Sequence, residues 1–265
     1  MSGRWDGTRV LVTGASSGIG AALAREMASQ GAIVGLCARR TALLDDVLTD
    51  CRRTSPGSRA WTVDLSDLEG LETFVRRVED GLGGIDVLVN NAGIMMDRAA
   101  VETPWQDLVR ITETDYYSPV RLTHAALPGM LARGGGHVVV VSSMAARMST
   151  PGEAAYAAAK AALTAYFEAL AGELWDSSVR FHLVYPALID VTPGVDGDDG
   201  MAATATGATR IPAPVLARDI RRQMERDELE LYMPYSMRQA VAERATDTAK
   251  SVAFMAGWFQ RGRPV

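Results

Sequence analysis

Short apolar runs alternate with longer amphipathic segments along the chain. Seven runs of five to seven residues occupy 9–13, 32–37, 59–63, 85–90, 137–142, 179–185 and 229–233. Several are apolar throughout instead of alternating, which is typical of strands buried on both faces of a parallel sheet. Seven such strands separated by helical segments predict one doubly wound (Rossmann-type) α/β domain over residues 1–265, with helices on both faces of a parallel seven-stranded sheet.

Two segments depart from this alternation. Residues 190–213 contain the stretch GVDGDDGMAATATGAT, which is rich in Gly, Asp, Ala and Thr. This segment is either a substrate lid or a long exposed loop, because long loops in compact domains often carry function. Residues 235–265 predict a C-terminal helical extension that packs on the domain, covers the site or contacts a partner subunit. Attachment to a membrane surface is less favoured, because its polar face carries mixed charge.

The composition places the chain among ordinary globular proteins. Its 265 residues are 48% hydrophobic and 22% charged, and the net charge is −5. No basic block supports nucleic-acid binding. No apolar run reaches the roughly 20 residues of a membrane-spanning helix. The N-terminal MSGRWDGTRV lacks the order of a signal peptide, so we expect a cytoplasmic protein without an integral membrane segment.

The cysteines and histidines do not predict a metal site. Cys37 and Cys51 lie in different predicted elements, and the three histidines are scattered. No CxxC or Cys/His spacing is present. We therefore expect two reduced thiols and no bound metal.

A glycine-rich turn follows the first predicted strand. The stretch TGASSGIG (13–20) opens a helix, and its glycines let the backbone turn tightly and approach a ligand closely. The N–H groups at the start of the helix then suit a pyrophosphate. The spacing is GxxxGxG instead of GxGxxG, but either spacing allows the same tight turn and close approach of a ligand. The residues expected to contact a dinucleotide here are Gly14, Ser16, Ser17, Gly18, Ile19 and Gly20.

The end of the second strand bears on the choice of dinucleotide. An NAD site usually has an acidic residue there for the ribose 2′-hydroxyl. This chain instead has Arg39 and Arg40 after Ala38. Because a guanidinium suits a 2′-phosphate, the pattern favours NADP(H) over NAD(H). The alternative is a pair of solvated arginines at a strand end.

The next two strand ends add further candidates. Asp64 ends the third strand, where its carboxylate is able to accept from an adenine amino group beside Leu65. Capping of the following helix is the alternative, although Ser66 has the capping-box spacing for that role. NNAG ends the fourth strand, and its Asn91, Ala92 and Gly93 suit close approach of a cofactor or simply form a turn.

The strongest chemical signal is YAAAK, which runs from Tyr156 to Lys160. Residues i and i+4 share a helix face, so the ammonium lies near the phenol. A nearby cation lowers the pKa of a phenol from about 10 towards working pH. Alone, such a pair is usually a surface pair. Thirteen residues before the tyrosine, Ser142 and Ser143 end the fifth strand, where a hydroxyl can bind a substrate carbonyl or merely terminate the strand.

Together these motifs resemble the short-chain dehydrogenase/reductase family over about residues 7–235. TGxxxGxG, NNAG, the strand-end serine, YxxxK and a later proline turn occur in the order and spacing of the family. The resemblance implies that Tyr156 is the general acid/base, and that Lys160 orients the nicotinamide ribose and lowers the pKa of the tyrosine. It also implies that Ser143 is the catalytic serine and that Arg39 marks an NADP preference.

The same resemblance assigns the segment YPALIDVTP (185–193) to the nicotinamide. In the family this segment approaches the ring through its backbone, which here implies Pro186 and Ile189. Ala187 replaces the usual glycine, and Thr192 is shifted by one position relative to the family pattern. The departure concerns the detailed contacts of the loop and leaves the reaction class unchanged.

Asp115 occupies the fourth catalytic position implied by the resemblance, where family members usually carry asparagine. In the family this residue acts largely through its main-chain carbonyl in a water relay to the lysine. Pro119 has no N–H to donate to the carbonyl of Asp115, so the sequence predicts a helix opened at this point. The backbone is therefore expected to matter more than the carboxylate, leaving either a working relay or a weakened enzyme.

The function implied is NADPH-dependent hydride transfer between nicotinamide and a carbonyl or alcohol, in the direction of ketone or aldehyde reduction. Met95, Met96, Met144 and Met148 are expected either to form a hydrophobic substrate pocket or to pack in the core. The alternatives are a non-catalytic NADPH-binding sensor or scaffold, and a dehydratase or epimerase, which usually has a longer C-terminal part. The resemblance also implies a homodimer or homotetramer, formed through the helices predicted over 104–132 and 152–175.

Overall fold

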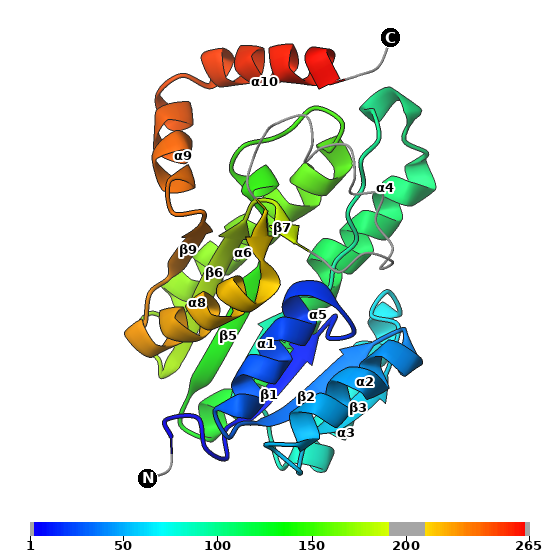
Figure 1. Ribbon diagram of the computed structural model, residues 1–265, viewed down its shortest axis with the longest axis vertical. Helices are drawn as coiled ribbons and strands as arrows, with labels where there is room; N and C mark the ends of the chain where they lie inside the picture. Colours follow the sequence, from blue (N-terminus) through cyan, green and yellow to red (C-terminus); the bar gives the residue numbers. More distant parts are fainter. Residues whose placement is uncertain (1–2, 191–209, 263–265) are drawn as a thin grey trace.

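The computed structural model describes residues 3–190 and 210–262 (Figure 1). Its main sheet contains seven parallel strands in the order β3-β2-β1-β4-β5-β6-β9, which confirms the predicted fold class. The strands are β1 Arg9–Thr13, β2 Ile33–Ala38, β3 Arg59–Thr62, β4 Val87–Asn90, β5 Gly136–Val141, β6 Val179–Pro186 and β9 Glu230–Met233. Each coincides with one of the seven apolar runs.

Helices cover both faces of this sheet (Figure 1). One face carries α1 Gly18–Ser29, α2 Thr41–Arg52 and α8 Ala213–Arg226, and α1 packs on both of the others. The opposite face carries α3 Leu71–Leu82, α5 Ser118–Ala132 and α6 Ala154–Glu173. Each face has its own hydrophobic core, and the sheet separates the two cores.

Alternate residues of the central strands enter opposite cores. In β1, Val10 and Val12 pack with α1 and α8, whereas Leu11 packs with the helices of the other face. All three side chains are fully buried. This two-sided burial is the reason that the strand is apolar throughout.

The helix before α5 is opened where the sequence predicted it. α4 Trp105–Thr112 continues into a π-helical turn, η3 Glu113–Tyr117, in which the Ser118 N–H donates to the Glu113 carbonyl. Pro119 follows at the start of α5, where it has no N–H to return to residue 115. The wider turn places Asp115 on the buried side, facing the sheet.

The C-terminal extension is helical, as predicted, and consists of α9 Met237–Thr246 and α10 Thr248–Gly262. Figure 1 shows α10 lying across the end of the molecule opposite the N-terminus. Among the described elements, its main neighbour is α9. Residues 191–209 of the predicted lid segment lie outside the described residues. The flanking residues form the short pair β7 Ile189–Asp190 and β8 Ile211–Pro212.

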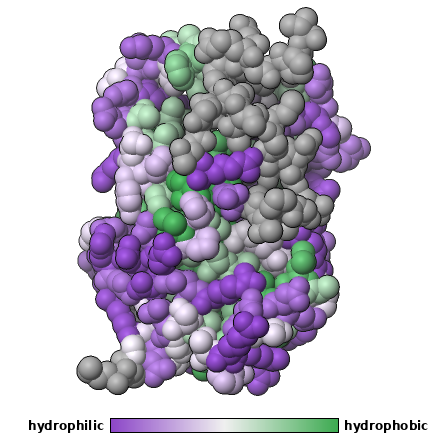
Figure 2. All heavy atoms as spheres, viewed as in Figure 1, coloured by the Kyte–Doolittle hydropathy of each residue, from purple (hydrophilic) through white to green (hydrophobic). Residues whose placement is uncertain are grey.

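The face of the molecule shown in Figure 2 is mainly hydrophilic among the described residues. On the face shown in Figure 2, hydrophobic residues form a broken band along the middle, bordered by hydrophilic residues. None of the described helices combines the length and the apolar character that crossing a membrane requires.

Both cysteines are free and buried, one in β2 and one in α2. Burial raises the pKa of the Cys37 thiol to about 12 and that of Cys51 to about 11. The neutral thiol is therefore the form present at physiological pH.

A pair of histidines connects the adjacent strands β5 and β6. His137 Nδ1 and His182 Nε2 are 2.9 Å apart, and the two rings stack with centroids 5.1 Å apart. His182 Nδ1 donates to the Glu228 carbonyl at 2.9 Å, so its Nε2 accepts from His137. Trp5 packs edge-on against His137. Burial lowers the pKa of His137 to about 4 and also lowers the pKa of His182.

Candidate active site

The candidate site lies at the carboxyl ends of β1, β4, β5 and β6. The strand order reverses between β1 and β4, because the chain passes from β1 outwards to β3 and then returns to the other side of β1. Open α/β sheets bind ligands at such a switch point. The strands end at Thr13, Asn90, Val141 and Pro186, and every predicted site residue follows a strand end or belongs to a helix beside one.

The glycine turn fits a bound pyrophosphate. Gly14 and Gly18 have φ values of +65° and +53°, which favour glycine. A Cβ on Gly20 would lie 2.5 Å from the Gly14 carbonyl oxygen and 2.5 Å from Asn91 Nδ2, so no larger residue fits. Ser17 at the start of α1 makes no side-chain cap, which leaves the first-turn N–H groups open to an anion.

Thr13 joins the glycine turn to the end of β4. Its buried hydroxyl donates to the Val89 carbonyl and accepts from the N–H groups of Asn91 and Ala92, at 2.9–3.0 Å. Asn91 Nδ2 donates to the Thr13 carbonyl at 2.8 Å. The Asn91 amide therefore holds the turn in place. The sequence did not single out Thr13, because its partners lie more than 70 residues away.

The two arginines after β2 have different neighbours. The Arg40 guanidinium donates to Ser17 Oγ at 2.6 Å and to Ser16 Oγ at 3.1 Å, so it lies directly against the glycine turn. Arg39 is exposed at the same strand end. Its charge helps to keep the pKa of Asp64 below the ordinary value, although the hydrogen bond from the Ser66 N–H is the larger cause. One cation thus lies against the turn, and the other acts on the acidic residue after β3.

The strand-end acid after β3 makes a local turn, and the predicted cap at Ser66 is wrong. Asp64 Oδ1 accepts from the Ser66 N–H at 3.0 Å and from Ser66 Oγ at 2.8 Å. The residue that caps the next helical turn, η1 Leu68–Gly70, is Asp67. Because the Ser66 hydroxyl is hydrogen-bonded to the Asp64 carboxylate, Ser66 is not the cap. Leu65 is buried beside them.

Ser143 and Tyr156 meet at the carboxyl end of β5. Ser143 precedes the short turn η4 Met144–Ala146, and its hydroxyl accepts from the Ala145 N–H at 3.1 Å. The Ser143 and Tyr156 side chains are also hydrogen-bonded to each other. Ser142 points away, because its buried hydroxyl pairs with Thr164 Oγ1 at 2.8 Å. Of the two strand-end serines, only Ser143 belongs to the site.

Lys160 lies one turn along α6 from the tyrosine, as the spacing predicts. Its Nζ is 5.7 Å from the centre of the Tyr156 ring and 3.3 Å from the Val141 carbonyl oxygen. Only 4% of Lys160 is exposed, so the ammonium needs a partner inside the protein.

That partner is the carboxylate of Asp115. Asp115 is fully buried, its Oδ2 is 3.2 Å from Lys160 Nζ, and its Oδ1 accepts from the Ile94 N–H at 2.8 Å. Gly93 closes over the pair, since a Cβ there would lie 2.8 Å from Asp115 Oδ2 and 3.1 Å from Lys160 Nζ. The carboxylate of Asp115 therefore has partners of its own in the site. Whether the backbone of this residue matters more than its side chain stays a prediction.

The net shift in the pKa of Tyr156 also differs from the expectation. Burial raises the pKa of Tyr156 above its ordinary value, Asp115 adds to the increase, and Lys160 only partly offsets it. Lys160 does act to lower the pKa of Tyr156, as predicted, but burial, which is the largest cause, and Asp115 together outweigh it. Burial acts to lower the pKa of Lys160, but Asp115 and Tyr156 together raise it, so the ammonium is retained.

The proposed nicotinamide segment leaves the sheet at the end of β6. Pro186 is buried as the last residue of the strand, and the Ala187 N–H donates to the Met233 carbonyl at 2.8 Å. Ile189 is half-buried in β7, paired with Ile211 of β8. Both candidate residues therefore lie at the same sheet edge as Ser143.

A second polar cluster, which the sequence did not reveal, supports η4 from behind. Arg147 directly follows this turn, and its guanidinium is bonded to the carboxylate of Glu168, to Tyr185 Oη at 2.7 Å and to Glu230 Oε1 at 3.0 Å. These partners come from α6, β6 and β9. Arg147 also lies over the Tyr185 ring. Four elements are thereby tied together behind Ser143.

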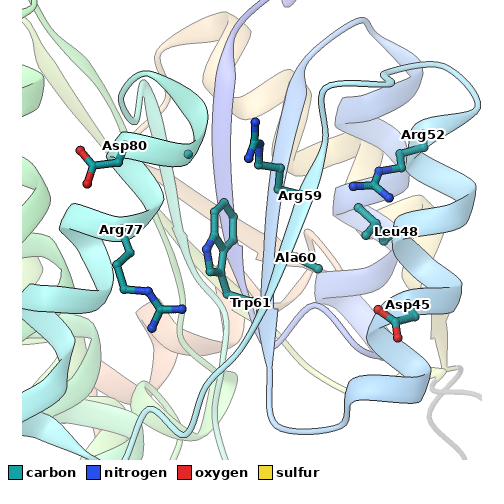
Figure 3. Close-up of a pocket in the computed structure, with 9 residues that line it drawn as sticks. Asp45, Leu48, Arg52, Arg59, Ala60, Trp61, Arg77 and Asp80 are labelled. Atoms are coloured by element: carbon teal, nitrogen blue, oxygen red, sulfur yellow. The ribbon is translucent and has the colours of Figure 1, made fainter.

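An open concavity of about 580 Å³ lies elsewhere, along the free edge of β3 (Figure 3). Arg59 and Trp61 reach it from β3, Asp45 and Arg52 from α2, and Arg77 from α3. None of the candidate site residues lines it. Its mixture of arginines and aspartates gives no single charge for a ligand to recognise. Within the described ranges, no group of three or more His, Cys, Asp or Glu side chains is arranged to hold a metal ion.

Comparison with known proteins now defines the class. The family model described as short chain dehydrogenase matches residues 8–199. The chain therefore belongs to the short-chain dehydrogenase/reductase family, whose members are oxidoreductases that use a nicotinamide cofactor.

Its relatives include enzymes of bacteria and animals. The chain is 37% identical to a fatty acyl-CoA reductase of Mycobacterium tuberculosis, over 78% of this chain and 73% of that protein. It is 34% identical to dehydrogenase/reductase SDR family member 7B of Bos taurus, over 75% of this chain and 62% of that protein. The chain thus matches somewhat under two thirds of the bovine relative.

Solved structures agree with this assignment. A metagenomic short-chain oxidoreductase in complex with NADP superposes with a TM-score of 0.70 at 29% identity, covering 82% of this chain and 90% of that one. A putative short-chain alcohol dehydrogenase from Sinorhizobium meliloti gives a TM-score of 0.71 at 28% identity, covering 80% and 88%.

Proposed function

We propose that the protein is an NADPH-dependent reductase of hydrophobic ketones or aldehydes. The observation that carries this proposal is the Tyr156 phenol, hydrogen-bonded to Ser143 and one helical turn from Lys160. These groups lie at the sheet edge that also bears the glycine turn. A proton donor, an oxygen-binding hydroxyl and an anion-binding turn are the parts that carbonyl reduction requires.

The cofactor would be held by residues from five loops of this edge. The glycine turn would take the pyrophosphate, Arg39 and Arg40 the 2′-phosphate, and Lys160 the nicotinamide ribose. The remaining proposed contacts are Asp64, Leu65, Asn91, Ala92, Gly93, Pro186 and Ile189. When bound, the nicotinamide supplies the hydride.

The preference for NADP(H) rests on charge. Arg40 lies beside the glycine turn, Arg39 precedes it at the end of β2, and residue 38 is an alanine where an NAD site usually has an acid. A structural neighbour is bound to NADP, which supports the same choice.

The protein side chains perform the proton step. Tyr156 gives its phenolic proton to the oxygen of the carbonyl as negative charge develops there. Ser143 binds the same oxygen and holds it near the phenol. Because the Ala145 N–H already donates to Ser143 Oγ, the hydroxyl hydrogen of the serine is free to turn towards substrate or tyrosine.

The substrate class follows from the apolar side chains near the site and from one relative. Met95 is 51% exposed after β4, where it is available to an apolar ligand. Met144 is instead 6% exposed and packs in the core, so it does not line a pocket. One relative is named as a fatty acyl-CoA reductase, whose substrate has an apolar chain attached to its carbonyl, and this supports a hydrophobic carbonyl substrate.

Assembly as a homodimer or homotetramer remains a prediction. Apart from Glu173 at its last position, the exposed residues of α6 are small and include Ala158, Ala161, Ala165 and Ala169. Such a face permits close approach of another helix.

The proposed activity predicts a large loss of turnover when the Tyr156 hydroxyl is removed. Consumption of NADPH is measured by its absorbance with a panel of apolar ketones and aldehydes, and with polar sugars for comparison. Tyr156→Phe should lower kcat about a hundredfold to ten-thousandfold, because the proton donor is lost. Its affinity for NADPH, measured by cofactor fluorescence, should change little.

Two outcomes would contradict the proposal. Turnover by Tyr156→Phe near the wild-type rate would remove the tyrosine from its role. Tight binding of NADPH without oxidation by any carbonyl in the panel would instead favour a sensor or scaffold that kept the fold.

A further inference from the structure

The buried pair formed by Asp115 and Lys160 changes the charge that Tyr156 faces. Lys160 Nζ lies 3.2 Å from Asp115 Oδ2, and both side chains are excluded from water. Two donors face the carboxylate, the ammonium and the Ile94 N–H at 2.8 Å. Burial raises the pKa of Asp115, and these two donors act in the opposite direction. Contact with the ammonium favours the ionised carboxylate, in which the pair carries one charge of each sign.

Other groups that act on the phenol are few. Ser143 is hydrogen-bonded to Tyr156, and Glu153 lies one turn earlier, at the start of α6. Burial raises the pKa of Glu153 to about 7, and the nearby Asp97 adds to the increase. A charged Glu153 also disfavours the phenolate. Lys160 is therefore the main cation available to stabilise a phenolate, and its charge is already matched by Asp115.

The physical consequence follows from Coulomb's law. A lone buried ammonium beside a phenol stabilises the phenolate and lowers the pKa of the phenol by one to several units. An ammonium in contact with a carboxylate is half of a dipole, and its field at the phenol is largely cancelled. A family pattern with asparagine at this position has no such cancellation.

We propose that Asp115 is a charge-compensating positioning residue: it neutralises Lys160, so that Tyr156 keeps its proton at neutral pH and the site is set to reduce carbonyls. This inference rests on the proposed oxidoreductase function. In reduction, the carbonyl carbon gains the hydride of NADPH and the oxygen gains the Tyr156 proton, which a solvent proton then replaces. In the reverse direction, Tyr156 must first lose its proton, so alcohol oxidation requires alkaline pH.

The first test measures the phenol directly and needs no substrate. The full-length protein is labelled with carbon-13 at tyrosine Cζ, and the Tyr156 resonance is assigned by its absence in Tyr156→Phe. The wild-type pKa should be at or above the ordinary value of about 10. In Asp115→Asn it should fall by about one unit or more, because the compensating charge is removed. Glu113→Gln removes a charge two residues earlier on the same turn and should leave the pKa unchanged.

The second test uses the pH profile of turnover. Carbonyl reduction should decline at high pH as Tyr156 loses its proton, and this decline should begin about one pH unit lower in Asp115→Asn. Oxidation of the corresponding alcohol should rise at a correspondingly lower pH. A variant that merely disturbs the structure would lower both rates without moving either profile.

The results separate this inference from the proposed function. A wild-type pKa below about 10, or an unchanged pKa in Asp115→Asn, would overturn the role of Asp115 even in an active reductase. An enzyme that reduces no carbonyl would fail the proposed function, while the resonance of Tyr156 would still decide the charge relationship.

Discussion

The two arginines after β2 illustrate how neighbouring residues of one type acquire different tasks. Arg40 contacts the hydroxyl groups of Ser16 and Ser17 on the glycine turn, whereas Arg39 is exposed and faces Asp64. A ribose 2′-phosphate bound beside the turn would be reached from both sides. In the proposed function, the discrimination between NADPH and NADH would be divided between two guanidinium groups.

Removal of either arginine should weaken NADPH more than NADH. Loss of one charge-assisted hydrogen bond to phosphate costs about 1.5–3 kcal/mol, so Arg39→Ala and Arg40→Ala should each raise the KM for NADPH roughly tenfold to a hundredfold. The KM for NADH should change by less than about threefold. Steady-state kinetics with both cofactors would measure the difference, and Arg52→Ala, an exposed arginine of α2, is the matched control. Equal changes for the two cofactors would exclude a role in 2′-phosphate recognition.

Residues with local partners were predictable from the sequence, and residues with distant partners were not. The i, i+4 spacing places Tyr156 beside Lys160, whatever surrounds them. Thr13 and Asp115 act through partners more than 20 residues away along the chain. Only the folded backbone brings these groups together, so the sequence indicated Asp115 but could not show that its carboxylate reaches Lys160.

At the scale of elements, η4 is the part of the site with the most support. It follows Ser143 and ends before Arg147, whose partners lie on α6, β6 and β9. Tyr185 is fully buried and stacks on Tyr232, with ring centroids 4.7 Å apart. The position of the serine hydroxyl is thus fixed by a cluster on the side of the turn away from the tyrosine.

Replacement of Arg147 should therefore affect stability and catalysis together. Arg147→Met leaves Glu168 and Glu230 without their common cation and should lower the free energy of unfolding by about 1–3 kcal/mol. The reductase kcat should also fall several-fold, because Ser143 loses its fixed position. Urea unfolding and activity at a temperature where the variant is folded measure the two effects.

The matched control for this change is Arg180→Met. Arg180 forms an exposed ion pair with Asp227 at 3.0 Å, far from Ser143, and such pairs contribute less than about 1 kcal/mol. An Arg147 variant that behaved like this control in both measurements would show that the cluster does not support the turn.

Elements were predicted well where hydrophobic pattern or proline chemistry decides them. All seven strands matched their apolar runs, and Pro119 predicted the opened helix that the π-helical turn provides. The cap at Ser66 was wrong, because Asp64 is the stronger acceptor and occupies both donors of that serine. Competition between neighbouring polar groups is decided by geometry that spacing does not contain.

At the scale of the whole molecule, the two ends of the sheet differ in charge. The carboxyl end carries ionised groups, whereas the histidine pair beneath the sheet is neutral and closed by Trp5. The indole of Trp5 donates to Glu225 Oε1 at 2.9 Å, which joins the N-terminal segment to α8. Protonation of both histidines would place two cations in contact within this closed region.

The histidine pair predicts a loss of stability in acid. His137 binds a proton near pH 6.5 when unfolded but only near pH 4 when folded, so the unfolded state takes up more protons between these values. The free energy of unfolding should therefore fall as pH drops from 6.5 to 4, by up to about 3 kcal/mol from this residue. Urea unfolding at a series of pH values measures the slope.

Variants at two of the histidines separate this effect from the titration of carboxylates. His137→Gln should flatten the dependence between pH 6.5 and 4. His124→Gln, which replaces an exposed histidine of α5, should retain the wild-type slope. The same slope in all three proteins would mean that the pair contributes nothing to acid unfolding. No sequence pattern predicted this pair, because its members are 45 residues apart in adjacent strands.

The two buried cysteines make the opening of the molecule measurable by the rate of thiol alkylation. Alkylating reagents attack thiolates, and neither Cys37 in β2 nor Cys51 in α2 is accessible or ionised at neutral pH. Alkylation of Cys37 thus records opening of the core under α3, α5 and α6, and alkylation of Cys51 records opening of the core under α1, α2 and α8. Comparison of the two labelling rates would show whether one face opens alone or both open only when the entire chain unfolds.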